Sequence, residues 1–113
     1  MKTSQTIDNL RYNVQCKVRE TITVQGTAKT LTAGNVTHTT YGKARYAEVT
    51  VTNASVRFTR DGSVTPAPAT HIGMILSTTQ VLPLYWNDIA NFTCIIEITG
   101  ATAYLQVDYF YDV

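Results

Sequence analysis

The sequence contains few cysteines and histidines and no long apolar run, and each absence narrows the possible functions. The two cysteines, Cys16 and Cys94, lie far apart and match no zinc or redox spacing, so we expect two free thiols. The two histidines have no nucleophile or ligand pattern beside them, and the six glycines form no phosphate-binding loop. We therefore expect a non-enzymatic protein with no catalytic residues, no metal and no cofactor.

Membrane and export signals are also missing from the sequence. No apolar run approaches the ~18 residues of a membrane span, and the polar start of the chain lacks the apolar core of a signal peptide. These features predict synthesis in a cytoplasm and no membrane partner. A length of 113 residues with 44% hydrophobic residues fits one folded domain.

Charge is unevenly distributed along the chain. All nine Lys and Arg residues lie in the first sixty positions, where only three acidic residues oppose them, which gives 9 − 3 = +6. The remaining positions hold five acidic residues and no basic ones, which gives −5. Either the two halves interleave in the fold, or the molecule has a basic and an acidic face suited to contact with copies of itself or with a charged lattice. The formal net charge of +1 argues against a nucleic-acid groove.

Apolar residues recur at every second position through much of the chain. Residues 12–24 show the longest alternation, interrupted on the apolar side only by Glu20, and a period of two is typical of a strand with one buried face. The other predicted strands are residues 29–33, 44–52, 56–59, 72–76, 81–86, 92–99 and 103–111, and residues 87–91 are predicted to form one helical turn. The predicted core consists of inward-facing strand residues, namely Val49, Val51, Val56, Phe58, Ile96, Ile98, Leu105 and Val107.

These short strands predict an all-β fold, an antiparallel β-sandwich of the jelly-roll or Ig-like kind, with an extended N-terminal arm or strand. Residues 1–20 are expected to form that N-terminal arm or first strand, and residues 21–113 a single β-sandwich domain. The first alternating segment exceeds the usual ~5–6 residues of a strand, so part of it is expected to reach a neighbouring subunit. The predicted assembly interface consists of Arg11, Tyr12, Lys17 and Arg19.

The pair Asp61-Gly62 predicts a turn, because glycine adopts a positive φ without steric penalty. The turn lies in residues 54–66, Ala-Ser-Val-Arg-Phe-Thr-Arg-Asp-Gly-Ser-Val-Thr-Pro, which precede the segments His-Ile-Gly-Met-Ile-Leu at 71–76 and Asn-Asp-Ile-Ala-Asn-Phe at 87–92. Together with Leu-Gln-Val-Asp-Tyr-Phe near the end of the chain, this order resembles small β-rich structural proteins of tailed bacteriophages.

The phage resemblance implies a virion component that is made in the host cytoplasm. The implied function is that of a capsid decoration or auxiliary protein, which binds the particle surface and stabilises it, with a neck or tail virion protein as the alternative. Its implied partners are the major capsid protein or other virion proteins, together with further copies of itself as a homo-oligomer. No catalytic residues carry over, because the matching positions are turn and core residues.

The hairpin at residues 58–66, Phe-Thr-x-Asp-Gly-x-x-x-Pro, is also similar to sandwich modules appended to secreted carbohydrate enzymes. Those modules more often have Ser-x-Pro where Val64 here separates Ser63 from Thr65. This second resemblance implies a carbohydrate-binding β-sandwich module as a further alternative. Aromatic side chains exposed in one line on a sheet face would favour it over the virion role. For Trp86, a place in the core or an interface is expected before a sugar platform.

Overall fold

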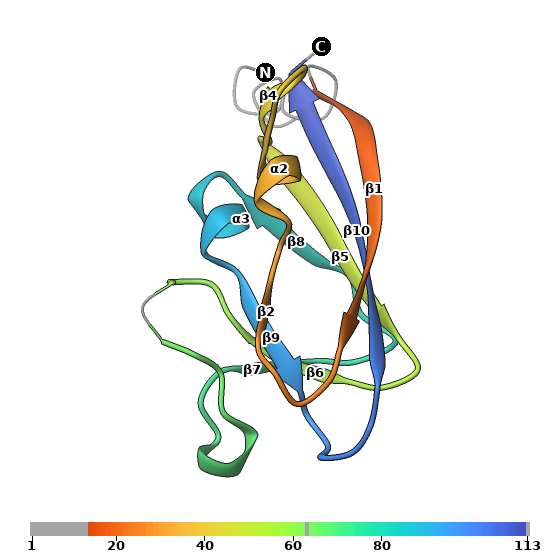
Figure 1. Ribbon diagram of the computed structural model, residues 1–113, viewed down its shortest axis with the longest axis vertical. Coiled ribbons are helices and arrows are strands. Elements are labelled where there is room, and N and C mark those ends of the chain that lie inside the picture. Colours follow the sequence, from red (N-terminus) through yellow and green to blue (C-terminus); the bar gives the residue numbers. More distant parts are fainter. Residues whose placement is uncertain (1–13, 63, 113) are drawn as a thin grey trace, which may run out of the picture.

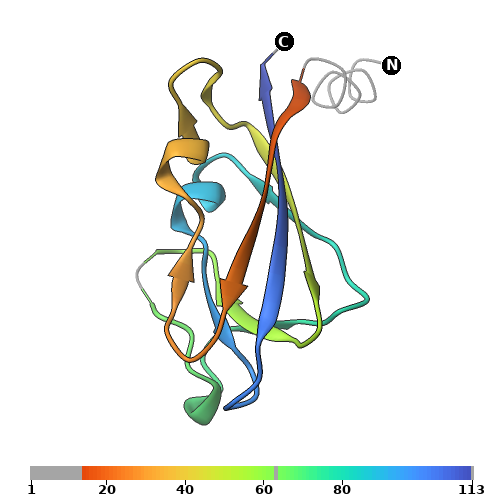
Figure 2. The same cartoon turned by 45° about the vertical axis from the view of Figure 1, so that its right-hand side comes forward.

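The computed structural model describes residues 14–62 and 64–112, and in this part of the chain two antiparallel four-stranded sheets pack face to face (Figure 1). Figure 2 shows the two layers, with β1, β5 and β10 in one of them. The elements are β1 (Val14–Val24), β2 (Lys29–Thr30), α2 (Ala33–Val36), β3 (Thr37–His38), β4 (Gly42–Lys43), β5 (Tyr46–Thr52), β6 (Val56–Thr59), η1 (Pro68–Thr70), β7 (Met74–Leu76), β8 (Leu82–Tyr85), α3 (Asn87–Asn91), β9 (Thr93–Ile96) and β10 (Ala103–Asp112).

The order of the strands identifies the topology. One sheet has the order β1-β10-β5-β8 and the other β2-β9-β6-β7, while β3 and β4 form a separate hairpin. With that hairpin left out and the remaining strands renumbered along the chain, the sheets read 1-8-3-6 and 2-7-4-5. This is the double Greek-key order of a jelly roll. The predicted antiparallel β-sandwich is confirmed, and the topology is that of a jelly roll and not an Ig-like fold.

The core lies between the two sheets and is formed by side chains of alternating strand positions. Seven of the predicted core residues are at most 4% exposed, namely Val49, Val51, Val56, Phe58, Ile96, Leu105 and Val107. The prediction for Ile98 is wrong, because its side chain is 66% exposed. The reason is that β9 ends at Ile96 and the chain then turns, with the amide of Ala101 donating to the carbonyl of Ile98. The period of two stops where the strand stops.

A β-bulge divides β1 into two parts. Cys16 pairs with Phe110 and Val18 with Tyr109, so Lys17 is an extra residue in the ladder. Such an insertion shifts the faces of the residues before it. Cys16 is therefore exposed, whereas the alternation alone predicted it on the buried side. From Val18 onward the predicted alternation holds, and Val24 is fully buried.

Glu20 interrupts the apolar side of β1, and it faces the inside of the sandwich. Glu20 accepts hydrogen bonds from the Thr32 hydroxyl at 2.6 Å and from the hydroxyl of Tyr109, whose side chain is fully buried. Burial acts to raise the pKa of Glu20, but the hydrogen bonds donated to its carboxylate outweigh this effect and hold the pKa below its ordinary value. Glu20 thus connects edge strand β1 to β10 and to the segment that leads into α2.

The predicted boundary at residue 20 falls inside β1. This strand pairs with β10 without a break in strand assignment from Val14 to Val24, with the bulge as the only shift in register. Residues 14–20, the described part of the predicted arm, therefore belong to the sandwich sheet as part of its edge strand. The rest of the predicted arm lies outside the described residues.

Candidate functional site

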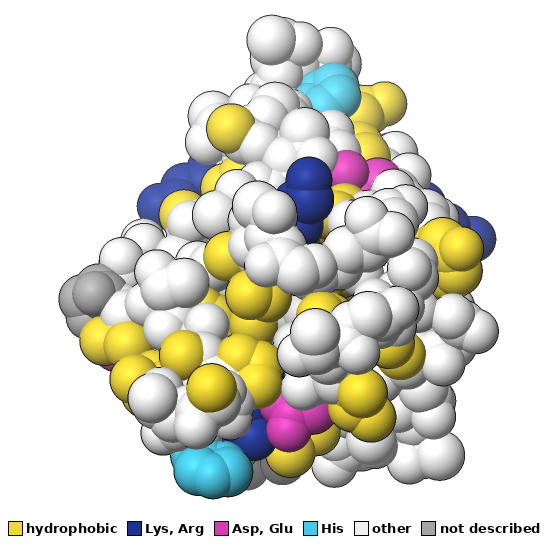
Figure 3. Space-filling model, turned by 60° about the horizontal axis from the view of Figure 1, so that its bottom comes forward, with side chains coloured by type: hydrophobic (Ala, Val, Ile, Leu, Met, Phe, Trp, Pro, Cys, Tyr) yellow, Lys and Arg dark blue, Asp and Glu magenta, His cyan; other side chains and the backbone are white. Residues whose placement is uncertain are grey.

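An exposed apolar edge ends the sheet that contains β7. This strand pairs with β6 on one side and is the last strand of its sheet. Ile72, Met74 and Ile75 are 40%, 60% and 48% exposed, and we call these three residues the β7 edge surface. β7 lies in the lower part of the view in Figure 1, and Figure 3, in which the bottom of that view comes forward, shows exposed hydrophobic side chains there. Because Met74 and Ile75 are consecutive strand residues, they make both sides of the edge apolar.

A partly buried ion pair helps to hold the β7 edge surface against the rest of its sheet. Arg57 is 6% exposed, and its Nε and NH2 groups donate to the Glu97 carboxylate at 2.8 and 3.0 Å. Its NH1 group donates to the carbonyl of Gly73 at 2.9 Å, directly before β7. The hydrogen bonds from Arg57 hold the pKa of Glu97 below its ordinary value. This forked contact fixes the entry of the chain into β7.

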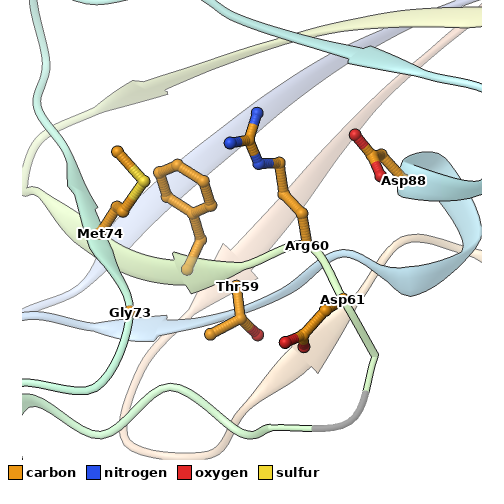
Figure 4. Close-up of a pocket in the computed structure, with 7 residues that line it drawn as sticks. Thr59, Arg60, Asp61, Gly73, Met74 and Asp88 are labelled. Atoms are coloured by element: carbon orange, nitrogen blue, oxygen red, sulfur yellow. The ribbon is translucent and has the colours of Figure 1, made fainter.

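Beside Met74 the surface is hollowed. The hollow has a volume of about 490 Å³ and is lined by residues that include Arg60, Asp61, Met74 and Asp88. Figure 4 shows the side chains of Arg60 and Asp88 on one side of the β6 backbone, with Asp61 pointing away to the other. The lining of the hollow therefore combines one cationic and two anionic residues with an exposed methionine, an arrangement suited to a mixed apolar and polar contact.

The predicted turn at Asp61 and Gly62 is a bend in a long connection. Gly62 has a φ of +74°, as predicted, and a Cβ built there would lie 2.9 Å from the side-chain oxygen of Asn91. The strand after the bend, β7, begins only at Met74, so the connection is longer than the tight hairpin that the Asp-Gly pair suggests. Gly73 has a φ of +102°, and a Cβ there would lie 2.7 Å from the carbonyl oxygen of Phe58.

The predicted assembly residues do not share one contact. Arg11 and Tyr12 lie outside the described residues. The ammonium of Lys17 lies over the ring of Tyr41, 5.9 Å from its centroid. Arg19 instead reaches across to β10 and pairs with Asp108, with an Nε–Oδ1 distance of 2.7 Å. The bulge at Lys17 separates the two side chains that the sequence placed on one polar face.

Ion pairs join the basic first half of the chain to the acidic second half. Arg19 pairs with Asp108, Arg57 with Glu97, and an NH1 of Arg45 approaches Asp112 at 2.6 Å. The jelly-roll order places β10 between β1 and β5, and β9 beside β6, and it thereby brings late acidic residues beside early arginines. Of the two interpretations of the charge distribution, these contacts favour interleaved halves.

The solvent side of the β1-β10-β5-β8 sheet, here called the outer sheet face, carries ordered rows of side chains. One row is aromatic: Tyr46 is opposite both Phe110 and Tyr85, with ring centroids 5.1 Å apart in each pair. The next row contains Arg19, Asp108 and Glu48, followed by a row of Thr21, Gln106 and Thr50.

The polar rows of the outer sheet face form a hollow of about 310 Å³. It is lined by Arg19, Glu48, Thr50, Val81, Gln106 and Asp108. Sequence reasoning did not find this site, because strand alternation shows which residues face outward but not which strands are neighbours. The sequence did contain one signal for this site, namely the polar residues Gln106 and Asp108 at outward-facing positions of β10.

The two histidines occupy structural positions. The Nδ1 atom of His38 accepts hydrogen bonds from the amides of Thr40 and Tyr41 at 3.0 and 3.4 Å, which closes the β3–β4 connection. His71 ends η1 in the left-handed conformation, with a φ of 59°. Both cysteines are free thiols, and only Cys94 is buried. Within residues 14–62 and 64–112, no cluster of His, Cys, Asp and Glu is arranged to hold a metal ion.

The comparisons with known proteins found no relative whose site could be compared with this geometry. Among the helices that the structure describes, none is long and apolar enough to cross a membrane. No protein-family model, curated protein or solved structure matches the chain.

Proposed function

We propose that the protein is a non-enzymatic structural component of a phage virion, a capsid decoration protein that docks on the particle through the β7 edge surface and stabilises it. The observation that carries this proposal is the exposure of Met74 and Ile75, 60% and 48%, on the last strand of a sheet. An uncovered apolar edge strand is a template for pairing with another chain, and proteins usually avoid one that has no partner.

The surroundings of the edge support docking of a defined partner. Arg57 anchors the backbone at Gly73, so the edge is held in place before a partner arrives. The hollow beside Met74 offers room for a side chain of the partner, with Arg60 and Asp88 as polar contacts at its rim. The jelly roll is also a fold that viral capsid proteins use, although the fold by itself assigns no function.

Fractionation of the source particles tests the proposal. Purified particles are separated on a density gradient, and the proteins of the particle band are identified and counted by mass spectrometry. We expect this chain in the particle band in a fixed ratio to the major capsid protein. Electron microscopy of the same particles then distinguishes the head surface from the alternative location at the neck or tail. Recovery of the chain only in the soluble fraction contradicts the virion role.

A variant pair tests the docking surface itself. Met74→Lys places a charge in the apolar edge and is expected to reduce occupancy on the particle at least about tenfold. Val81→Lys is the matched control, because Val81 is also 60% exposed but lies next to β8 in the other sheet. Equal occupancy of the two variants, with both folded by circular dichroism, would remove the β7 edge surface from the proposal.

A further inference from the structure

We propose that the outer sheet face binds a neutral oligosaccharide, with a sugar ring stacked on the aromatic row and sugar hydroxyls bonded to the polar rows beside it. This inference goes beyond the proposed virion function and does not depend on it. It rests on the lateral order of four strands, β1, β10, β5 and β8, which brings together residues that are distant in the sequence.

The aromatic row provides a fixed stacking surface. Tyr85 is 41% exposed on the edge strand β8, and the ring of Tyr46 supports it at a centroid distance of 5.1 Å. Phe110 supports Tyr46 from the other side at the same distance. Rings held by their neighbours lose little conformational freedom when a ligand arrives, and the C–H face of a sugar ring is the kind of apolar surface that an aromatic ring covers.

The polar rows provide hydrogen-bonding groups at fixed positions. The Tyr46 hydroxyl donates to Glu48 at 2.8 Å, which joins the aromatic row to the first polar row. Asp108 is held by Arg19 at 2.7 Å, and Thr21 donates to Gln106 at 3.0 Å. Of these residues, Arg19, Glu48, Gln106 and Asp108 line the hollow of about 310 Å³. A sugar hydroxyl both donates and accepts, so it matches a surface that mixes carboxylates, an amide and hydroxyls on rigid strands.

Charge on this face selects the class of ligand. The first polar row has one positive and two negative side chains, Arg19 against Asp108 and Glu48, which gives 1 − 2 = −1. At the end of the aromatic row, the guanidinium of Arg45 lies 4.1 Å from the centroid of the Trp86 ring and is paired with Asp112. Single-stranded nucleic acids need a positively charged groove next to their stacking aromatics, and anionic glycans need the same excess of positive charge. A neutral, hydroxyl-rich ligand is the class that fits.

A glycan array followed by a titration tests the inference. The full chain, carrying a fluorescent label on its amino groups, is applied to printed neutral glycans that include cellohexaose, maltohexaose and chitohexaose, with polygalacturonate and an oligothymidylate as anionic probes. The strongest soluble binder is then titrated into isotope-labelled protein. We expect saturable shifts of backbone amide signals centred on Tyr46, Tyr85 and Gln106, and no comparable response to the two anionic probes.

Substitution of tyrosines with similar exposure distinguishes binding at the outer sheet face from non-specific binding elsewhere on the protein. Tyr85→Ala is expected to weaken binding at least about tenfold, and Gln106→Ala by about threefold to tenfold. Tyr41→Ala is the control, because Tyr41 is 40% exposed but packs with His38 and Tyr111 on the other side of the sheet. Should Tyr85→Ala fail to fold, the map of shifts in the unaltered protein decides. The inference is overturned by an array without a neutral binder, by shifts that map away from this face, or by equally tight binding of an anionic probe.

Discussion

Arg57 and Glu97 form a forked ion pair in which the Nε and NH2 groups of the arginine donate to both carboxylate oxygens, at 2.8 and 3.0 Å. The same arginine donates its third hydrogen bond to the carbonyl of Gly73. One side chain on β6 therefore connects the end of β9 with the start of β7. This arrangement makes Arg57 a side-chain anchor of the β7 edge surface, in addition to the pairing of β7 with β6.

Replacement of this arginine is expected to loosen the β7 edge. Arg57→Lys keeps the charge but loses the fork, so it cannot reach Glu97 and Gly73 together. We expect a lower melting temperature and faster hydrogen exchange of the amides in β7, measured by calorimetry and mass spectrometry. Arg60→Lys, on an exposed neighbour outside this contact, is expected to change neither quantity. Unchanged exchange in β7 of Arg57→Lys would show that the strand is held by other contacts.

Phe58 packs in the core, 3% exposed, with its ring centroid 5.8 Å from that of Phe92. Phe58→Ala is expected to lower the free energy of unfolding by about 3–5 kcal/mol, because it leaves a cavity between the sheets. Ile98→Ala, at a site that is 66% exposed, is expected to change it by less than about 0.5 kcal/mol. Denaturation in urea measures both values. Equal costs for the two substitutions would contradict this placement of the core.

Gly62 occupies a backbone conformation that side chains rarely adopt, and the space beside it is filled by Asn91. Gly62→Val is expected to cost about 1–3 kcal/mol of stability, from strain at positive φ together with displacement of that side chain. Gly26→Val is the control, because a Cβ at Gly26 has no atom within 4 Å. A chemical denaturation curve for each variant gives the comparison, and similar midpoints would argue against the bend at residues 61 and 62.

The lowered pKa of Glu20 predicts that the folded protein loses stability in acid. Its pKa is lowered in the folded protein, so the unfolded chain binds the proton more tightly. The stabilisation is complete above the ordinary pKa of 4.5 and disappears as the pH falls through the lower folded value. Glu20→Gln should therefore melt at a lower temperature at pH 7 and show a shallower further loss below pH 4.5. Melting curves of both proteins between neutral and acidic pH check this, and parallel pH profiles would contradict it.

The two thiols are expected to react differently. Cys16 is exposed, whereas burial raises the pKa of the Cys94 thiol to about 12. A thiol reagent such as dithionitrobenzoate should therefore modify one cysteine in the native protein and the second only after unfolding. Cys16→Ser should abolish the native reaction and Cys94→Ser should leave it. Native modification of both thiols would show that Cys94 is accessible and that the core around β9 is open.

The sequence alone was enough to predict those features of local structure that depend only on residues close together in the chain. The alternation of Val49 and Val51 predicts which side of β5 is buried, because successive side chains of a strand point to opposite faces. The helical turn at residues 87–91 was predicted and is α3. The positive φ of Gly62 was predicted because glycine alone adopts it at little cost.

Tertiary structure decided which strands are neighbours and where the ladders shift. Tyr46, Tyr85 and Phe110 form one row only because β10 and β8 flank β5, and this pairing depends on contacts between segments that are distant in sequence. The bulge that turns Cys16 outward arises from its register with β10, which the alternation of β1 by itself does not contain. A period of two assigns each residue to a face, whereas hydrogen bonding between distant strands and packing of the two sheets select the partner and the register.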